Sequence, residues 1–287
     1  MSQSFKRQPP PQTYGVVSFP TPHVMLVIFN RPKALNSMTS SGQYELESLF
    51  AWYDNEPSLR CAVITGAGRA FCAGMDLKEW NAANARRACG KHELSPMMPR
   101  SGFGGLSRRH GKKPVIAAVN GLAFGGGMEI VANLDLVVAA RSAKFALPEA
   151  KRGVVAMAGS LPRLARTIGR PRAMELALTG RSITAAEAKE WGIVNSVTED
   201  AGDCEVLERP VVKAALELAA SVVNSSPDSV IISRAGIISG YEDGSAENAS
   251  RLLSENWGFA LDNGQNLHEG VLAFAEKRSP KWIDSKL

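Results

Sequence analysis

The chain has 287 residues, of which 45% are hydrophobic, so it can form one large globular domain or a domain with an appendage. No apolar run reaches the roughly 18 residues that cross a bilayer, so we expect a soluble protein without a membrane-spanning segment. The formal net charge of +5 suits an anionic ligand. The basic residues lack the aromatic platform or motif of a nucleic-acid-binding protein, so we expect no nucleic-acid partner.

The cysteines and histidines give no sign of a disulfide framework or a metal centre. The four cysteines lack Cys-x-x-Cys spacing, which favours free thiols in a reducing compartment. The four histidines are scattered without the spacing of metal ligands, so no metal is expected.

The chain begins with a polar, proline-containing stretch that has no apolar signal-peptide core, and we expect residues 1–14 to be a flexible tail. Apolar runs and helical patterns then alternate. The predicted strands cover residues 24–29, 61–65, 114–119, 135–140 and 193–197. The predicted helices cover residues 39–54, 78–83, 128–133, 161–168 and 172–179, and a capping box at 184–187 opens another. Residues 84–113 break the pattern and predict a mobile, partly helical surface segment that covers a pocket.

Only helical patterns follow from about residue 206. One helix face is formed by Val212, Leu216, Ala219 and Val222, and another by Leu267, Val271, Phe274 and Ala275. The sequence therefore predicts an α/β core at 15–205 and a helical region at 206–284. The apolar stripes of that region have two possible partners, the core and a second subunit.

The core is organised around the stretch Phe124-Gly-Gly-Gly-Met-Glu129, which joins a predicted strand to a predicted helix. Three glycines allow a tight turn and close approach of a ligand to the backbone. The first N–H groups of a helix have no internal partner, so they can hold an oxygen that becomes anionic. Glu129 beside this position suggests proton transfer at a carbon next to a carbonyl. The alternative is a glycine turn that only packs closely, with Glu129 as a favourable first-turn charge.

A second strand-to-helix turn, Phe71-Cys-Ala-Gly-Met-Asp76, resembles the first. Two such turns that point N–H donors at one oxygen would form an oxyanion hole. Removal of one donor from such a pair typically costs ~2.7–4 kcal/mol of transition-state stabilisation.

These motifs and several others resemble the crotonase (enoyl-CoA hydratase/isomerase) superfamily. The matching segments occur in family order over roughly residues 15–282. They are residues 30–36, 64–66, 71–78, 120–129, 145–149, 173–180 and 269–278.

The resemblance implies a spiral of ββα units with a helical C-terminal region that builds trimers, often paired into hexamers. It implies an acyl-CoA thioester substrate and no metal or redox cofactor, because coenzyme A is part of the substrate. It places the oxyanion hole at the backbone N–H groups of Met75 and Gly126. It places the substrate and its coenzyme A at Ala34, Asn36, Met75, Asp76, Leu77, Lys78, Gly126 and Lys277, with the two lysines near the phosphates.

The chemistry that the resemblance implies depends on two acidic positions, which are Glu129 and Glu149 here. Hydration of a 2-enoyl-CoA needs one group to take a proton from water and one to protonate C2, and two carboxyl groups can do this. As in the family, Glu129 is assigned to the water and Glu149 to C2, and the reverse dehydration uses the same groups. The alternatives are a Δ3,Δ2-enoyl-CoA isomerase, against which the second glutamate argues, and a non-catalytic acyl-CoA-binding protein.

Two further features modify this expectation. The loop at 153–160 departs from the Gly/Pro-rich loop of many hydratases, and we expect Met157 and Ser160 to reshape the acyl pocket. The chain ends in Ser285-Lys286-Leu287, a tripeptide that the peroxisomal import receptor reads. We therefore expect an exposed C-terminus and a peroxisomal protein, which fits acyl-CoA hydration because that reaction belongs to β-oxidation.

Overall fold

The computed structural model describes residues 5–88, 98–202 and 204–287. Its described part contains a six-stranded sheet with the order β1-β2-β3-β5-β7-β10 and a four-stranded sheet with the order β4-β6-β8-β9. The strands of the first sheet are β1 (Gly15–Thr21), β2 (Val24–Phe29), β3 (Cys61–Gly66), β5 (Val115–Val119), β7 (Leu136–Ala140) and β10 (Ser196–Thr198). Those of the second are β4 (Ala70–Cys72), β6 (Leu122–Phe124), β8 (Lys144–Ala146) and β9 (Ser182–Thr184).

The chain winds between the two sheets as a spiral. In each of the pairs β3/β4, β5/β6 and β7/β8, the first strand joins the large sheet and the second joins the small one. Neighbouring strands from successive turns of the spiral are parallel, whereas β1 and β9 pair antiparallel with β2 and β8. The predicted spiral of ββα units is therefore confirmed. It places the carboxyl ends of β4 and β6 side by side, where both glycine turns begin.

Successive side chains of each strand point to opposite faces of the large sheet, so they contribute to two separate apolar layers. In β2, Met25 and Val27 face the layer between the sheet and α1 (Ser40–Asn55), while Leu26 faces α7 (Pro210–Val223) on the other side. Helix α1 begins where Thr39 Oγ1 accepts a hydrogen bond from Gly42 N at 3.2 Å, as expected for an N-cap threonine. Both faces of the parallel strands are therefore covered, which explains their continuous apolar sequence.

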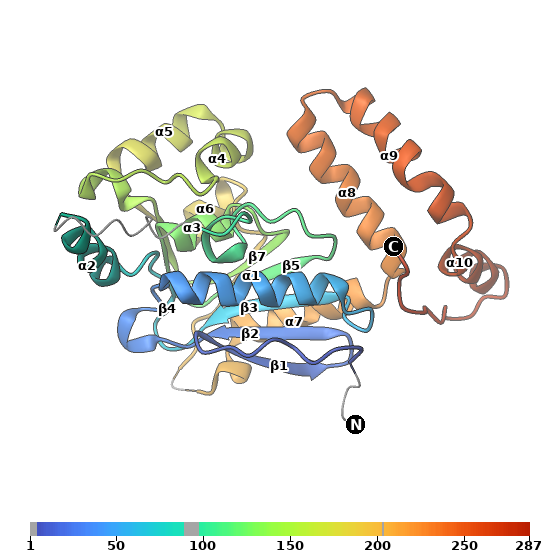
Figure 1. The fold of residues 1–287 in the computed structure, drawn as a ribbon. Helices are drawn as coiled ribbons and strands as arrows, with labels where there is room; N and C mark the ends of the chain where they lie inside the picture. Colours follow the sequence, from blue (N-terminus) through green and yellow to red (C-terminus); the bar gives the residue numbers. More distant parts are fainter. Residues whose placement is uncertain (1–4, 89–97, 203) are drawn as a thin grey trace.

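The other helices surround this core, and α8, α9 and α10 project from it as a separate arm (Figure 1). Their stripe residues Val271 and Phe274 are 64% and 87% exposed, so this stripe does not pack on the core. The bounds are α2 (Leu77–Ala88), α3 (Gly126–Val131), α4 (Ser160–Ile168), α5 (Arg170–Thr179), α6 (Ala185–Glu190), α8 (Pro227–Asp243), α9 (Ala246–Asp262) and α10 (Gln265–Ala275). The described residues also form four short 3₁₀ turns: η1 (Pro32–Ala34), η2 (Phe103–Gly105), η3 (Pro148–Arg152) and η4 (Val206–Glu208).

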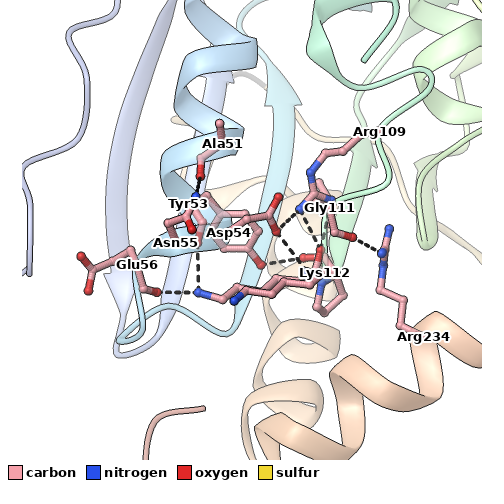
Figure 2. A network of polar contacts seen from close by, with 12 residues as sticks. Ala51, Tyr53, Asp54, Asn55, Glu56, Arg109, Gly111, Lys112 and Arg234 are labelled. Carbon is pink, nitrogen blue, oxygen red and sulfur yellow. Dashed lines mark hydrogen bonds and ion pairs between the residues drawn. The ribbon is translucent and has the colours of Figure 1, made fainter. Parts of the chain in front are cut away.

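A buried polar network joins the end of α1 to the segment before β5 (Figure 2). Arg109 donates to Asp54 Oδ1 at 2.5 Å and to the carbonyl of Lys113 at 3.1 Å. Lys113 Nζ donates to the carbonyl of Tyr53 at 3.0 Å, and burial lowers the pKa of Lys113 to about 8. Arg234, in the middle of α8, donates to the carbonyl of Gly111, so the network also contacts the first helix of the arm.

Residues near both ends of the described chain contact the folded core, whereas the sequence predicts a flexible tail at residues 1–14 and an exposed C-terminus. The Phe5 ring lies 4.5 Å from the Phe19 ring, centroid to centroid, and Tyr14 is buried. At the other end, Lys112 Nζ donates to the C-terminal residue Leu287, which is partly buried.

The segment 84–113 also differs from the surface segment that its composition predicts. Helix α2 continues to Ala88, and residues 89–97 lie outside the described part of the chain. Phe103 and Leu106 are 2% and 0% exposed, so this part of the segment belongs to the core. Among the described helices, none is both long and apolar enough to cross a membrane.

Candidate active site

A pocket of about 550 Å³ lies where the turn before α2, the start of α3 and the segment 148–158 meet. Most of its lining is apolar, and its charged members among the described residues are Glu129, Glu149 and Arg152. The apolar lining includes Leu35, Met75, Leu77, Trp80, Met98, Phe103, Leu122, Phe124, Val154, Val155 and Met157. A largely apolar pocket with a few polar groups that face its interior is the usual form of a small-molecule site.

The glycine turn at the start of α3 fits only residues without a side chain. Gly125 has a φ of +55°, and a Cβ on Gly126 would lie 2.5 Å from the Phe103 ring. Gly74, with a φ of +93°, lies against this turn, because a Cβ there would be 3.1 Å from Gly126 N. The two predicted turns therefore meet backbone to backbone.

The predicted oxyanion-hole amides belong to this junction. Met38 forms a parallel bridge with Met75 through Gly74 O and Asp76 N, at 2.8 and 2.9 Å, which leaves the N–H of Met75 unused by the bridge. Gly126 is the first residue of α3, so its N–H has no carbonyl one turn earlier. In the described structure, neither amide N–H donates to a protein group, and both residues line the pocket.

The Glu129 side chain is 4% exposed and is held by the loop after η3. Its Oε1 accepts hydrogen bonds from Ala158 N at 2.8 Å, Ser160 Oγ at 3.0 Å and Ser160 N at 3.5 Å. Burial raises the pKa of Glu129 from 4.5 to about 7, the hydrogen bond from Ser160 opposes this rise, and the nearby Glu149 charge adds to it. Glu129 therefore titrates in the neutral range, which suits a general acid or base.

Glu149 lines the same pocket and lies in the first turn of η3, directly after Pro148. Its Oε1 lies 3.1 Å from the position that a Cβ would take on Gly125. Its Oε2 is buried and has no hydrogen-bond partner among the described residues. Burial raises the pKa of Glu149, and the positive charge of Arg152 opposes the rise. Both predicted catalytic carboxyls therefore lie beside the junction of the two turns.

The predicted coenzyme A residues divide into two groups. Three of them line the pocket: Met75, Leu77 and Gly126. Five do not line it: Ala34, Asn36, Asp76, Lys78 and Lys277.

Three of these five have other positions in the fold. Asn36 is fully buried, and its Nδ2 donates to the carbonyl of Ala70 at 2.7 Å, so it holds the turn before α1. Asp76 pairs with Arg31 at 2.9 Å and caps the start of α2. Lys277 follows α10, which Figure 1 places on the other side of the molecule from α2. Because Leu77 and Trp80 of α2 line the pocket, α10 does not lie beside the pocket within one chain.

Several pocket residues have no specific sequence signal. Phe103 lies in the Gly- and Ser-containing segment that predicts surface, and Trp80 lies beyond the matched motif at 71–78. Of the two residues that the sequence predicts to reshape the acyl pocket, Met157 lines it and Ser160 does not, and the contact of Ser160 with Glu129 depends on the tertiary fold. In the described part of the chain, no group of three or more His, Cys, Asp or Glu residues has the arrangement of a metal site.

Comparisons with known proteins agree with this fold. A sequence profile described as Enoyl-CoA hydratase/isomerase matches residues 21–285. The mevalonyl-coenzyme A hydratase SIDH of Beauveria bassiana is 51% identical over 99% of this chain and 100% of its own length. The mevalonyl-coenzyme A hydratase sidH of Aspergillus fumigatus is 47% identical over 95% and 96%. The carnitinyl-CoA dehydratase of Proteus mirabilis is 38% identical over 90% and 94%.

A solved structure of an enoyl-CoA hydratase has the same fold. The enoyl-CoA hydratase of Mycobacterium tuberculosis superposes with a TM-score of 0.81 and 32% identity, over 96% of this chain and 100% of that one. The chain belongs to the enoyl-CoA hydratase/isomerase family, the crotonase superfamily.

Proposed function

We propose that the protein is a coenzyme A ester hydratase or dehydratase that interconverts a 2-enoyl-CoA and a 3-hydroxyacyl-CoA. The observation that carries this proposal is that two carboxyls with raised pKa values and two unpaired amide N–H groups line one apolar pocket. The names of the relatives, which are hydratases and dehydratases of coenzyme A esters, support the same class of reaction.

In the hydration direction, Glu129 takes a proton from water while the water oxygen bonds to C3. The C2=C3 electrons move toward the thioester, whose oxygen becomes negative and receives hydrogen bonds from Met75 N and Gly126 N. Glu149 then supplies a proton to C2, and the enolate returns to a thioester. Dehydration of a 3-hydroxyacyl-CoA runs through the same groups in reverse, and this scheme needs no metal or redox cofactor.

The active form of the pair carries one proton. Burial favours the neutral form of both carboxyls, and the negative charge of one disfavours ionisation of the other. The donors on Glu129 Oε1 favour its carboxylate form, which is the form that accepts a proton from water. Glu149 has no such donors from other residues, and the hydration scheme requires it to be the partner that carries the proton.

Mevalonyl-CoA is the first candidate substrate, because the two fungal relatives at 51% and 47% identity carry that name. A mevalonyl group has a hydroxyl and a methyl group on C3, so its dehydration gives a branched 2-enoyl thioester. The apolar walls beside the two glutamates, which include Leu35, Trp80 and Phe103, suit such a branch. Under this proposal the dehydration serves a specialised pathway rather than general β-oxidation.

Two other functions remain as outcomes of the test. A Δ3,Δ2-enoyl-CoA isomerase needs one carboxylate to move a proton between C4 and C2, which leaves no role for the second carboxyl. A non-catalytic binding protein needs no carboxyl at all in the pocket, whereas both Glu129 and Glu149 line it.

The assembly and location of the protein are also proposals. The exposed apolar residues Phe259 and Phe274 on the helical arm support a homotrimer or a pair of trimers. In such an assembly, Lys277 of a second subunit is the candidate for a coenzyme A phosphate. The terminal Ser285-Lys286-Leu287 supports import into the peroxisome.

The test uses purified protein with a panel of esters: mevalonyl-CoA, straight-chain 3-hydroxyacyl-CoA, 2-enoyl-CoA and 3-enoyl-CoA. Absorbance of the conjugated enoyl thioester reports the reaction. We expect this absorbance to appear with mevalonyl-CoA. The reaction should reach the same equilibrium from the 3-hydroxyacyl-CoA and from the 2-enoyl-CoA. Conversion of 3-enoyl-CoA without any hydration would identify an isomerase, and binding without turnover of any ester would identify a binding protein.

A further inference from the structure

The carboxylate of Glu129 is held on one side only. All three hydrogen bonds that it receives from described residues go to Oε1, and two of the three come from Ser160. Its Oε2 receives none of these hydrogen bonds. Because the Glu129 side chain lines the pocket, Oε2 is the oxygen available to a water or a substrate.

Ser160 is placed for this contact by the local backbone. It is the first residue of α4 and follows Gly159, whose φ of +115° requires glycine. A serine at a helix start commonly caps its own helix, but α4 has no side-chain cap. Ser160 is fully buried, and the described hydrogen bond of its Oγ is directed to Glu129 at 3.0 Å.

We propose that Ser160 is a positioning residue for the hydration reaction, whose hydroxyl fixes Glu129 Oε1 and keeps the carboxylate ionised with Oε2 toward the substrate. This inference rests on the proposed function of Glu129 as the general base. A hydroxyl that donates to a carboxylate stabilises the charged form, and this effect is larger in a buried site than in water. The start of α4 adds the positive end of a helix dipole on the same side.

Other groups near Glu129 act on its charge, and the test has to separate them from Ser160. Glu149 of η3 opposes ionisation, and Arg152 of the same turn faces Glu149. Arg163 and Arg108 flank Gly159, and Arg163 is already paired with Glu242 at 3.1 Å. On β4, burial raises the pKa of the Cys72 thiol to about 12, so it is uncharged. Replacement of Ser160 changes none of these charges.

The experiment compares wild type with Ser160→Ala in the pH dependence of kcat/KM for a 2-enoyl-CoA between pH 5 and 9. Loss of the hydroxyl raises the pKa of Glu129, so the acidic limb moves up by about one pH unit. The variant is then about tenfold slower at pH 6, which is the factor that one pH unit gives, and within about threefold of wild type at pH 9. A purely structural role predicts a similar loss at every pH, and that result would overturn the inference.

A second measurement does not depend on turnover. In protein with ¹³C-labelled glutamate carboxyls, the Glu129 signal is assigned by its loss in Glu129→Gln, and its titration midpoint is followed by NMR. We expect the midpoint to rise in Ser160→Ala. The matched control is Thr65→Val, which removes another fully buried hydroxyl whose Oγ1 donates to the carbonyl of Ala118 at 2.8 Å. This control lowers thermal stability and leaves the midpoint unchanged.

The outcomes also separate the two proposals. If wild-type protein hydrates no ester, or if its acidic limb survives in Glu129→Gln, the proposed function of Glu129 is wrong. If that limb depends on Glu129 but has the same midpoint in Ser160→Ala as in wild type, only the role of Ser160 is wrong.

Discussion

The Phe103 ring lies so close to Gly126 that a single added methyl group would reach to 2.5 Å from it. This contact fixes where α3 begins and therefore where the Gly126 amide points. We predict that Gly126→Ala displaces this amide and lowers kcat/KM by about 10²–10³-fold, as expected for loss of one oxyanion-hole donor. Steady-state hydration kinetics, with circular dichroism to confirm folding, would show this loss.

The matched control is Gly240→Ala in α8, where an added Cβ meets no atom within 4 Å. Alanine favours the helix at this position, so activity stays at the wild-type level. If Gly126→Ala were as active as Gly240→Ala, the Gly126 amide would not be part of the site.

The pH dependence of hydration follows from the raised pKa of Glu129, which lies at about 7. The general base has to be ionised to take a proton from water. Hydration by wild type therefore rises about tenfold per pH unit below pH 7, and it falls again at the higher pH where Glu149 loses the proton that it supplies to C2. This limb is absent from the residual activity of Glu129→Gln. A flat profile between pH 5 and 8 in the wild type would contradict the role of Glu129.

The same shift makes Glu129 a source of pH-dependent stability. Its pKa is raised from 4.5 to about 7 in the folded protein, so the folded state binds the proton more tightly than the unfolded state. The stabilisation is complete below about pH 4.5 and is lost as pH rises through 7. The free energy of unfolding of Glu129→Gln, relative to that of wild type, should therefore be roughly 2–4 kcal/mol higher at pH 8 than at pH 4.5. Urea unfolding of both proteins at the two pH values measures this change. The same relative stability at both pH values would contradict the raised pKa of Glu129.

The network at the end of α1 predicts a large stability effect away from the pocket. The side chains of Arg109 and Asp54 are 5% and 16% exposed, so Asp54→Ala leaves a buried guanidinium without its carboxylate. We expect a loss of roughly 3–5 kcal/mol in the free energy of unfolding. The control is Glu199→Ala, which removes the partner of Arg141 in a pair that is 70% and 66% exposed and should cost less than about 1 kcal/mol. Equal losses in both variants would show that the buried ion pair contributes no more to stability than the exposed pair.

The C-terminal tripeptide gives a prediction about location. Deletion of Ser285–Leu287 should leave hydration in extracts unchanged, because these residues are distant in the chain from every pocket residue and none of them lines the pocket. The truncated protein should become cytosolic, since the receptor-read address is gone. Fluorescence microscopy of an N-terminally tagged chain tests this, and peroxisomal import of the truncated form would contradict the address.

The local signals that the sequence predicted well are those fixed by short-range chemistry. The capping box is present, because Thr184 Oγ1 accepts from Glu187 N while Glu187 Oε2 accepts from Thr184 N. The glycine turn before Glu129 is also where the sequence places it, because consecutive glycines allow the tight turn that begins α3. These features need only a few neighbouring residues to form, so a sequence reveals them.

The features that the sequence did not predict depend on distant contacts. Strands β6, β8 and β9 have three residues each, and they form by pairing with one another rather than by their own patterns. Phe103 lies among glycines and serines, yet the tertiary fold packs its ring against Gly126. Asn36 matches a coenzyme A motif, but the structure uses its amide to hold a turn. Sequence identity at a motif position therefore does not distinguish a ligand contact from a structural contact.

The measurement that tests the central claim most directly is hydration of a 2-enoyl-CoA by wild type, Glu129→Gln and Glu149→Gln, with ester binding measured in parallel. The claim is that both carboxyls act on one substrate in one pocket. Each glutamine variant should then lose about 10²–10⁴-fold in kcat while it binds the ester nearly as tightly as wild type does. Turnover at the wild-type rate in either variant would contradict the two-carboxyl mechanism.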